Sequence, residues 1–157
     1  MDRKEFFRKL KQEPKIQKKY NIEEVIFYYE ELIQDAVDNG EIELTNIESF
    51  NNIDGRNSNG SIFLDGVIGK NLDFVTSNGK ITTSNISFDN LKLITSNGEI
   101  EASVLGIKSE YKIRISTSLG SRYIDGEKVD QSIFNTNQEN YITIQSSNSS
   151  VRLNFDN

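Results

Sequence analysis

The 157-residue sequence contains no cysteine and no histidine, and these two absences exclude much of the chemistry that side chains perform. Without cysteine, the chain forms no disulfide and offers no thiolate nucleophile. Without histidine, it lacks the usual general base and the commonest metal ligand, so Ser-His-Asp and Cys-His arrangements are excluded. No phosphate loop of the form G-x-x-x-x-G-K-[ST] and no calcium-binding nonapeptide repeat occurs. We therefore expect a protein that is not an enzyme and uses no cofactor or metal.

The sequence also lacks a long apolar run. No stretch approaches the roughly 20 apolar residues that span a bilayer. The N-terminal stretch MDRKEFFRKLKQ is charged throughout, without the apolar centre of a signal peptide. These features predict a cytoplasmic protein, with association at the cell surface left open. The net charge of −6 disfavours nucleic acid as a partner, because nucleic acid attracts basic surfaces.

Residues 1–40 have a helical pattern. Apolar residues recur there at intervals of three and four, which predicts two helices separated near Pro14. Residues 1–21 hold eight Lys and Arg against three acids, whereas residues 22–40 hold six acids and no base. Opposite charges suit an antiparallel helical hairpin. The alternative is a first helix that detaches and binds a membrane surface or a signalling partner.

From residue 41, β-branched residues recur at alternating positions and Asn-Gly pairs interrupt the pattern, which is typical of strands and turns. TSNGKI begins at Thr76, TSNGEI begins at Thr95, and the weaker copy NSNGSI begins at Asn57, so the spacing is 19 residues both times. Aligned on the glycines, the flanking aliphatic residues fall at the same offsets. The isoleucines two positions later are Ile42, Ile62, Ile81 and Ile100. The C-terminal tail follows the same template with Ser149 in the glycine position, so the pattern is an internal repeat.

A repeat of this length suits one coil of a β-solenoid, with successive coils stacked about 4.8 Å apart. We predict a mainly β protein in which residues 41–157 form a single-chain β-solenoid of about five coils. A loop insertion is expected near residues 123–140, and the helical hairpin of residues 1–40 is expected to cap one end. The other end is expected at Arg152 to Phe155, either shielded by the insertion or docked to another molecule. A homo-oligomer through this C-terminal end of the solenoid therefore stays open.

The SNG motif is interpreted as the corner of each coil, where asparagine and glycine allow a positive φ and the asparagine amides form a ladder. The alternative is a ligand-binding motif that recurs in each coil. The residues of the predicted corner ladder are Ser58, Asn59, Gly60, Ser77, Asn78, Gly79, Ser96, Asn97 and Gly98. Three aromatic residues in or beside the insertion are candidates for binding a partner, namely Tyr123, Phe134 and Tyr141. The alternative is that they fold the insertion onto the rod.

Two features together resemble known bacterial families. The recurring TSNG-x-I motif resembles a family of bacterial adhesin-like β-strand repeats without an established biochemical function, over roughly residues 41–157. The segment EEVIFYYEELIQDAVDNG at 23–40 resembles a truncated form of the helical HAAS-type domain that often precedes such repeats. Its matching residues are Tyr28, Tyr29, Glu30, Glu31, Ile33, Asp35, Ala36 and Gly40. The resemblance implies a bacterial protein connected with envelope stress or with interactions at the cell surface.

Three functions follow from these features. The leading hypothesis is a non-enzymatic interaction or scaffold module with a protein partner. The second is a regulatory protein whose basic first helix leaves the acidic second helix and reports envelope stress to a membrane or signalling partner. The third is a protein that binds a glycan or another surface ligand through its Asn-, Ser- and Thr-rich corners.

Overall fold

The structure is a computed structural model that describes residues 40–156. The predicted helical hairpin of residues 1–40 and its capping role lie outside the described residues, apart from Gly40. The described residues belong to the compact unit Val37–Asn157 and form a mainly β, solenoid-like repeat.

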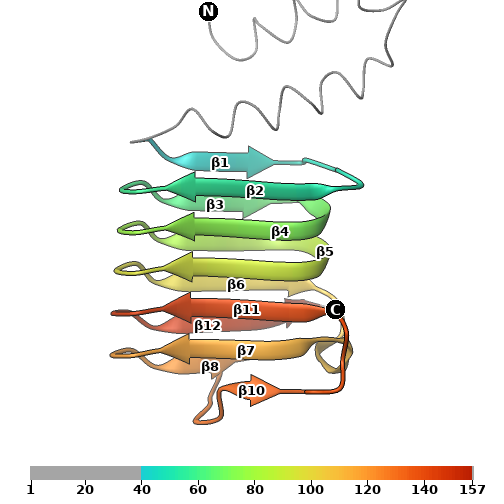
Figure 1. Ribbon diagram of the computed structural model, residues 1–157, viewed down its shortest axis with the longest axis vertical. Coiled ribbons are helices and arrows are strands. Elements are labelled where there is room, and N and C mark those ends of the chain that lie inside the picture. The colour runs from blue at the N-terminus through green and yellow to red at the C-terminus, as the bar shows by residue number, and fades with distance from the viewer. Residues whose placement is uncertain (1–39, 157) are drawn as a thin grey trace, which may run out of the picture. The chain divides into compact units, whose positions relative to one another are not determined.

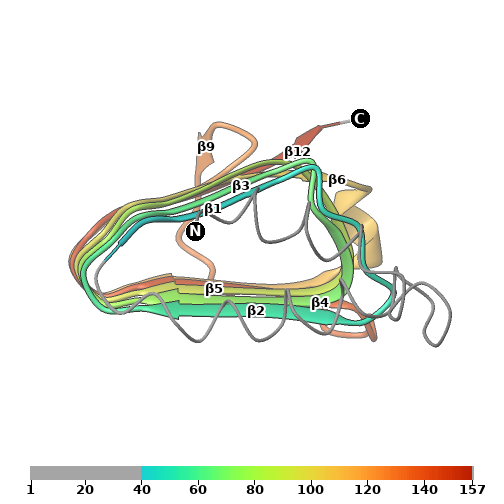
Figure 2. The ribbon, with the colours of Figure 1, turned by 90° about the horizontal axis from the view of Figure 1, so that it is seen from above.

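The chain winds in coils around a buried core, and the strands of these coils stack in two parallel sheets (Figure 1). Seen along the stacking direction, the sheets are the long sides of a flattened loop (Figure 2). Sheet A contains, in spatial order, β1 (Ile42–Thr45), β3 (Ile62–Asp65), the first part of β5 (Ile81–Thr95), β6 (Ile100–Leu105), β12 (Val151–Asp156) and β8 (Arg122–Ile124). Sheet B contains β2 (Asn52–Asn57), β4 (Ile68–Thr76), the second part of β5, β11 (Tyr141–Ser146) and β7 (Lys112–Thr117).

Equivalent side chains of successive coils lie over one another, as the repeat predicts. Ile62 is the Cα partner of Ile42 and of Ile81, and Ile81 is the partner of Ile100. Inward and outward positions alternate along each strand, so these columns fill the space between the sheets. The largest fully buried side chains are Phe74, Ile62, Leu64, Leu72, Ile81, Ile86, Leu91, Leu93, Ile100, Ile113, Ile115 and Ile124. The predicted stack of isoleucines is therefore confirmed.

The spatial order of the coils differs from their order in the sequence. The chain leaves β6, passes through η2 (Lys108–Glu110) and enters β7, yet β11 lies between β5 and β7 (Figure 1). In the same way, β12 lies between β6 and β8. We call residues 141–156 the inserted coil and residues 112–124 the end coil. The prediction that the rod ends at Arg152 to Phe155 is wrong, because β8 pairs with β12 at Val151 to Leu153 on the side away from β6.

The predicted insertion near residues 123–140 contains strands of its own. Its first residues, Tyr123 and Ile124, belong to β8. Two short strands then pair antiparallel with the end coil: β9 (Glu127–Lys128) with β8, and β10 (Ile133–Phe134) with β7. They occupy the outer edges of the end coil, where short strands hinder the addition of a further strand.

Candidate functional site

The SNG motif forms the corner at which the chain passes from sheet B to sheet A. Glycine is required there because neighbouring coils nearly touch. A Cβ on Gly79 would stand 1.9 Å from the carbonyl oxygen of Gly60, and a Cβ on Gly98 would stand 1.8 Å from that of Gly79. Among residues 40–156, none of those with positive φ lies in these SNG corners. The prediction of a positive φ there is wrong, and the requirement for glycine comes from contact between coils.

Positive φ occurs at the opposite turn, where the chain leaves sheet A. Asn46, Gly66 and Asn85 occupy this turn in successive coils, with φ values of 54°, 62° and 52°. Asparagine and glycine are the residues that adopt this conformation at the least cost. Asparagine and glycine do adopt a positive φ in this fold, but they do so at the turn after sheet A and not at the SNG corner.

An asparagine ladder runs along the SNG corners. Asn78 Nδ2 donates to Asn59 Oδ1 at 2.8 Å, and Asn97 Nδ2 donates to Asn78 Oδ1 at 2.6 Å. The ladder continues through Asn148 of the inserted coil, whose amide donates to Asn97. In the end coil the equivalent position is Leu119, which has no side-chain amide to extend the ladder and is 79% exposed. The neighbouring serines contribute through the backbone, because the carbonyl groups of Ser58, Ser77 and Ser96 accept hydrogen bonds from the amide N–H groups of Asn78, Asn97 and Asn148.

The threonine that opens TSNG has a role that sequence reasoning missed. The Thr95 hydroxyl is buried, donates to the carbonyl oxygen of Gly79 at 3.0 Å and accepts from the N–H of Gly98 at 3.2 Å. One side chain thus satisfies two buried backbone groups. The sequence does show this pattern, because a hydroxyl residue recurs three positions before the glycine, or before Ser149, of the corners that follow Gly60. Besides Thr95, these residues are Thr76, Thr117 and Ser146.

A second asparagine ladder was also missed. Asn71 Nδ2 donates to Asn52 Oδ1 at 2.6 Å, and Asn90 Nδ2 donates to Asn71 Oδ1 at 2.7 Å. Asn90 Oδ1 then accepts from the backbone N–H of Tyr141 at 3.0 Å. The spacing of 19 residues between positions 52, 71 and 90 could have revealed this ladder. It lies on sheet B and leads from the first coils to the start of the inserted coil.

The outer face of sheet A carries charges that neutralise one another. Lys80 pairs with Glu101 and lies 3.7 Å from Glu99, and Arg152 pairs with Glu99 and lies 3.9 Å from Glu101. The guanidinium carbon of Arg152 is 5.1 Å from the centre of the Tyr123 ring, a cation–π contact. The charged groups of this network are therefore already occupied.

The outer face of sheet B begins in the same way. Arg56 binds both carboxylate oxygens of Asp73, at 3.0 and 3.2 Å, and Lys92 lies 3.2 Å from the same carboxylate. Partial burial acts to raise the pKa of Asp73, but the hydrogen bonds and charges of Arg56 and Lys92 outweigh it, so this pKa lies below its usual value.

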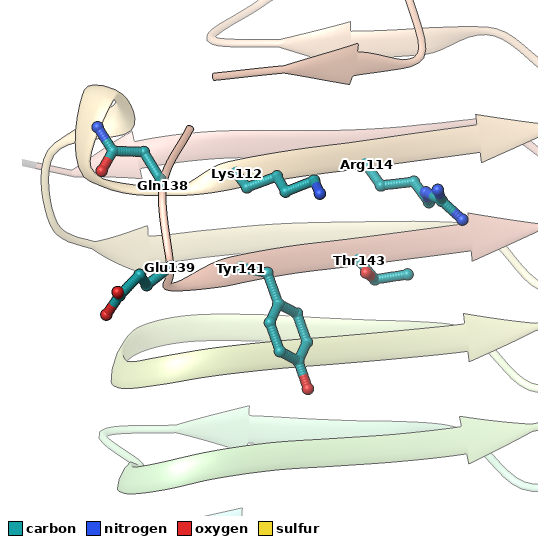
Figure 3. A pocket seen from close by; sticks show the side chains of 6 residues that line it. All are labelled: Lys112, Arg114, Gln138, Glu139, Tyr141 and Thr143. Carbon is teal, nitrogen blue, oxygen red and sulfur yellow. The ribbon is translucent and has the colours of Figure 1, made fainter. Parts of the chain in front are cut away.

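The other half of sheet B carries two neighbouring cations that pair with no residue between 40 and 156. Lys112 and Arg114 lie side by side along β7, next to Tyr141 and Thr143 on β11 (Figure 3). Both cations are exposed, and neither side chain forms a hydrogen bond or ion pair with any residue between 40 and 156. A shallow, open hollow of about 290 Å³ lies among them. We call its lining the β7–β11 face: Lys112, Arg114, Gln138, Glu139, Tyr141 and Thr143.

Tyr141 connects this hollow to a second one. The second hollow, of about 430 Å³, is lined by Tyr141 together with residues of β2, β4 and β5, including Asp73 and Lys92. The Tyr141 side chain is 42% exposed although its strand is paired on both sides. An exposed aromatic ring that lines two adjoining hollows is a feature typical of interaction surfaces.

The three aromatic candidates do not come together. Tyr123 lies on sheet A beneath Arg152, and Phe134 lies in β10, half-buried against the core. Only Tyr141 lies on the β7–β11 face. Tyr111 forms aromatic pairs with Phe88 and Phe155, whose ring centres lie 5.4 and 6.3 Å from its own. Burial raises the pKa of Tyr111, and its hydroxyl donates to the carbonyl oxygen of Phe88 at 3.1 Å.

Two further observations concern the described part of the chain. Between residues 40 and 156, no group of three or more acidic side chains is placed to hold a metal ion. No helix within this same range is long and apolar enough to cross a membrane.

Comparison with curated proteins and comparison with solved structures each found no significant match. The sequence does match the family described as Toastrack DUF4097, over residues 15–156. The matched range covers the whole solenoid and also residues 23–40, for which a separate helical family was expected. The match covers far more than half of the chain. The chain therefore belongs to the Toastrack DUF4097 family, an uncharacterised family of β repeats.

Proposed function

We propose that the protein is a non-enzymatic interaction module whose β7–β11 face binds an acidic, extended segment of a protein partner. The observation that carries this proposal is the lack of partners for Lys112 and Arg114 among residues 40–156. The basic side chains of Arg56, Lys80, Lys92, Lys108 and Arg152 all have acidic partners. Two exposed cations left unpaired beside each other are free to accept carboxylates from another molecule.

The spacing of the two cations favours an extended partner. Residues two apart on a strand are roughly 7 Å apart and point to the same side, as do alternate side chains of an extended peptide. Carboxylates at every second position of such a peptide match Lys112 and Arg114 in turn. Tyr141 supplies the apolar contact, and tyrosine and arginine are the residue types that contribute most at interfaces.

The fixed backbone of the β7–β11 face also favours binding of a partner. β11 is hydrogen-bonded to β5 on one side and to β7 on the other, so the backbone beneath Tyr141 and Thr143 is fixed before the partner arrives. A preformed surface loses little conformational entropy on binding. The resemblance to adhesin-like repeats suggests the same general role.

The glycan-binding alternative has less support from the corners. Asn78 uses its Nδ2 group for Asn59 and its Oδ1 atom for Asn97, so the ladder already engages the groups that a sugar would need. The regulatory alternative depends on residues 1–39, which the structure does not describe. We therefore favour an acidic protein segment over a glycan.

Fluorescence anisotropy with a labelled peptide of alternating Glu and Ser tests the proposal. We expect saturable binding that weakens as salt rises. Arg114→Glu should weaken it by about tenfold, which corresponds to about 1.4 kcal/mol. The matched control is Lys128→Glu, which changes the net charge equally at an exposed cation of β9 that has no partner among the described residues.

The control should bind within about twofold of the unmodified protein, since it lies outside the β7–β11 face. Equal losses in the two variants would mean that only net charge matters, and would contradict the proposal. Equally strong binding of a Gln-Ser peptide would also contradict it, because that peptide has no carboxylates.

A further inference from the structure

The end coil is attached to the other coils through the inserted coil. Within residues 40–156, the parallel partner of β7 is β11 and the parallel partner of β8 is β12. Neither β7 nor β8 pairs directly with β5 or β6 in this range. The chain thus builds a slot between β5 and β6 on one side and β7 and β8 on the other, and the inserted coil fills it.

The slot offers a complete set of contacts on both sides. Ile142, Ile144, Val151 and Leu153 of the inserted coil are fully buried. On one side, Ser146 Oγ donates to the carbonyl oxygen of Gly98 at 2.9 Å. On the other side, Thr117 Oγ1 donates to the carbonyl oxygen of Ser149 at 2.8 Å.

The connections on either side of the end coil make contacts that involve no residue of the inserted coil. The connection from β6 to β7 is held to the earlier coils by the Tyr111 hydroxyl, which donates to Phe88. Asn135 Nδ2 donates to the carbonyl oxygens of Lys108 and Tyr111, at 2.9 and 3.1 Å. Gln138 Nε2 donates to that of Ser109 at 2.7 Å. The Tyr111 hydroxyl therefore holds the β6–β7 connection to the earlier coils, and Asn135 and Gln138 hold the connection before β11 to residues 108–111.

The inserted coil joins the rest of the chain through an exposed connection. Residues 135–140, which lead from β10 to β11, are all exposed to solvent. A change of path in this connection would release the inserted coil without breaking a contact in the core of the other coils.

We propose that the slot is an interaction surface whose partner is the inserted coil of a second copy of this chain. In the resulting dimer, each copy places residues 141–156 in the slot of the other, with the same hydrogen bonds and the same buried side chains as in the single chain. Such an exchange changes the path of residues 135–140, and with it the bonds that Asn135 and Gln138 make to residues 108–111. At low concentration the intramolecular arrangement is favoured by its high effective concentration, so the exchanged dimer forms when chains refold together at high concentration.

The native sequence contains no cysteine, so single cysteines report the exchange directly. Gln145 of β11 is the Cα partner of Ile94 of β5, and both point to the outer side of sheet B. An Ile94→Cys copy and a Gln145→Cys copy, with different tags, are refolded together at high concentration and oxidised. A disulfide between the two tags forms when the inserted coil of one copy occupies the slot of the other.

The matched control replaces Ile94→Cys by Val75→Cys. Val75 is the neighbour of Ile94 in the same column, one strand further from Gln145. Its Cα atom is about 9.6 Å from that of Gln145, which exceeds the reach of a disulfide. We expect at least about tenfold more mixed disulfide from Ile94→Cys than from Val75→Cys, because only the first pair lies within disulfide reach.

Equal yields from the two pairs would overturn the proposal, because random collision would then explain the disulfide. The Ile94→Cys/Gln145→Cys double variant provides a cis comparison. If it forms its disulfide within one chain while the single variants give no mixed product, the slot accepts only its own coil and the proposal is wrong. The result does not depend on the acidic partner proposed above, since neither cysteine lies on the β7–β11 face.

Discussion

The small residues of the SNG corner and the charged residues of the β7–β11 face differ in what they contact. At the corner, the glycines of successive coils lie against one another, and the threonine and asparagine side chains bond to the neighbouring coil. On the β7–β11 face, Lys112 and Arg114 extend from an equally regular strand and contact no partner among residues 40–156. The corner therefore determines how the coils stack, whereas the face leaves its charges available to another molecule. We expect substitutions at the corner to change stability and substitutions on the face to change binding.

The largest effect is expected for Gly79→Ala. The added methyl group would stand 1.9 Å from the carbonyl oxygen of Gly60, so two coils must move apart. We expect a loss of about 3 kcal/mol in the free energy of unfolding. Urea denaturation measures it as a lower midpoint. Ser77→Ala, at an exposed position of the same corner, is the control and should change stability by less than about 0.5 kcal/mol.

Thr95→Val is expected to have the next largest effect. Valine keeps the shape but removes the hydroxyl that bonds to Gly79 and Gly98, and it leaves two backbone groups without partners. The cost of such unpaired groups is about 2 kcal/mol. Thr82→Val is the matched control on the outer side of sheet A, where the change should stay within about 0.5 kcal/mol. Similar losses in both variants would show that the corner hydroxyl has no special role.

Asn78→Ala tests the ladder in its middle. The variant loses the hydrogen bonds to Asn59 and to the Ser58 carbonyl and the one from Asn97, all exposed, so we expect a loss of about 1 kcal/mol. The control is Asn137→Ala in the exposed connection before β11. Glycan-array binding that disappears in the Asn78 variant while its stability is unchanged would contradict the structural role and favour a ligand-binding corner.

The smallest effect is expected for the protonation of Asp73, on the outer face of sheet B. The pKa of Asp73 in the folded protein lies below the value of 3.8 expected in the unfolded chain. The stability that Asp73 contributes is therefore present above about pH 4 and is lost as pH falls through the lower, folded-state pKa. Because the carboxylate is partly exposed, we expect less than about 1 kcal/mol. Urea midpoints of the native protein and of Asp73→Asn, compared between pH 6 and pH 2, measure the difference, which should shrink as pH falls.

Much of the solenoid could be predicted because each coil repeats the same contacts. The positions of Ile62, Ile81 and Ile100 in one column follow from their spacing and the two-residue period of a strand. The asparagine ladder at 59, 78 and 97 follows from the same spacing. The equivalent spacing at 52, 71 and 90 contained the second ladder, which escaped notice because those asparagines are not followed by glycine.

The order of the coils could not be predicted from the repeat. Since all coils share one template, Ile113 fits a column beside Leu91 as well as it fits beside Ile142. The actual order depends on contacts between residues far apart in the sequence, such as those of Tyr111 with Phe88 and of Asn135 with Lys108. The β7–β11 face was missed for the same reason, because Lys112 and Tyr141 become neighbours only when the inserted coil is in place.

The insertion of residues 141–156 also has a consequence during synthesis. Residues 112–124 leave the ribosome before the coil that attaches them to the rest of the rod. Synthesis proceeds at about 5–20 residues per second, so the growing chain spends on the order of a second or more with its half-built stack open at two edges. Binding by a chaperone in that interval would protect these edges. The coil that is synthesised after residues 112–124 lies in the interior of the stack, whereas a simple rod would lengthen at its tip.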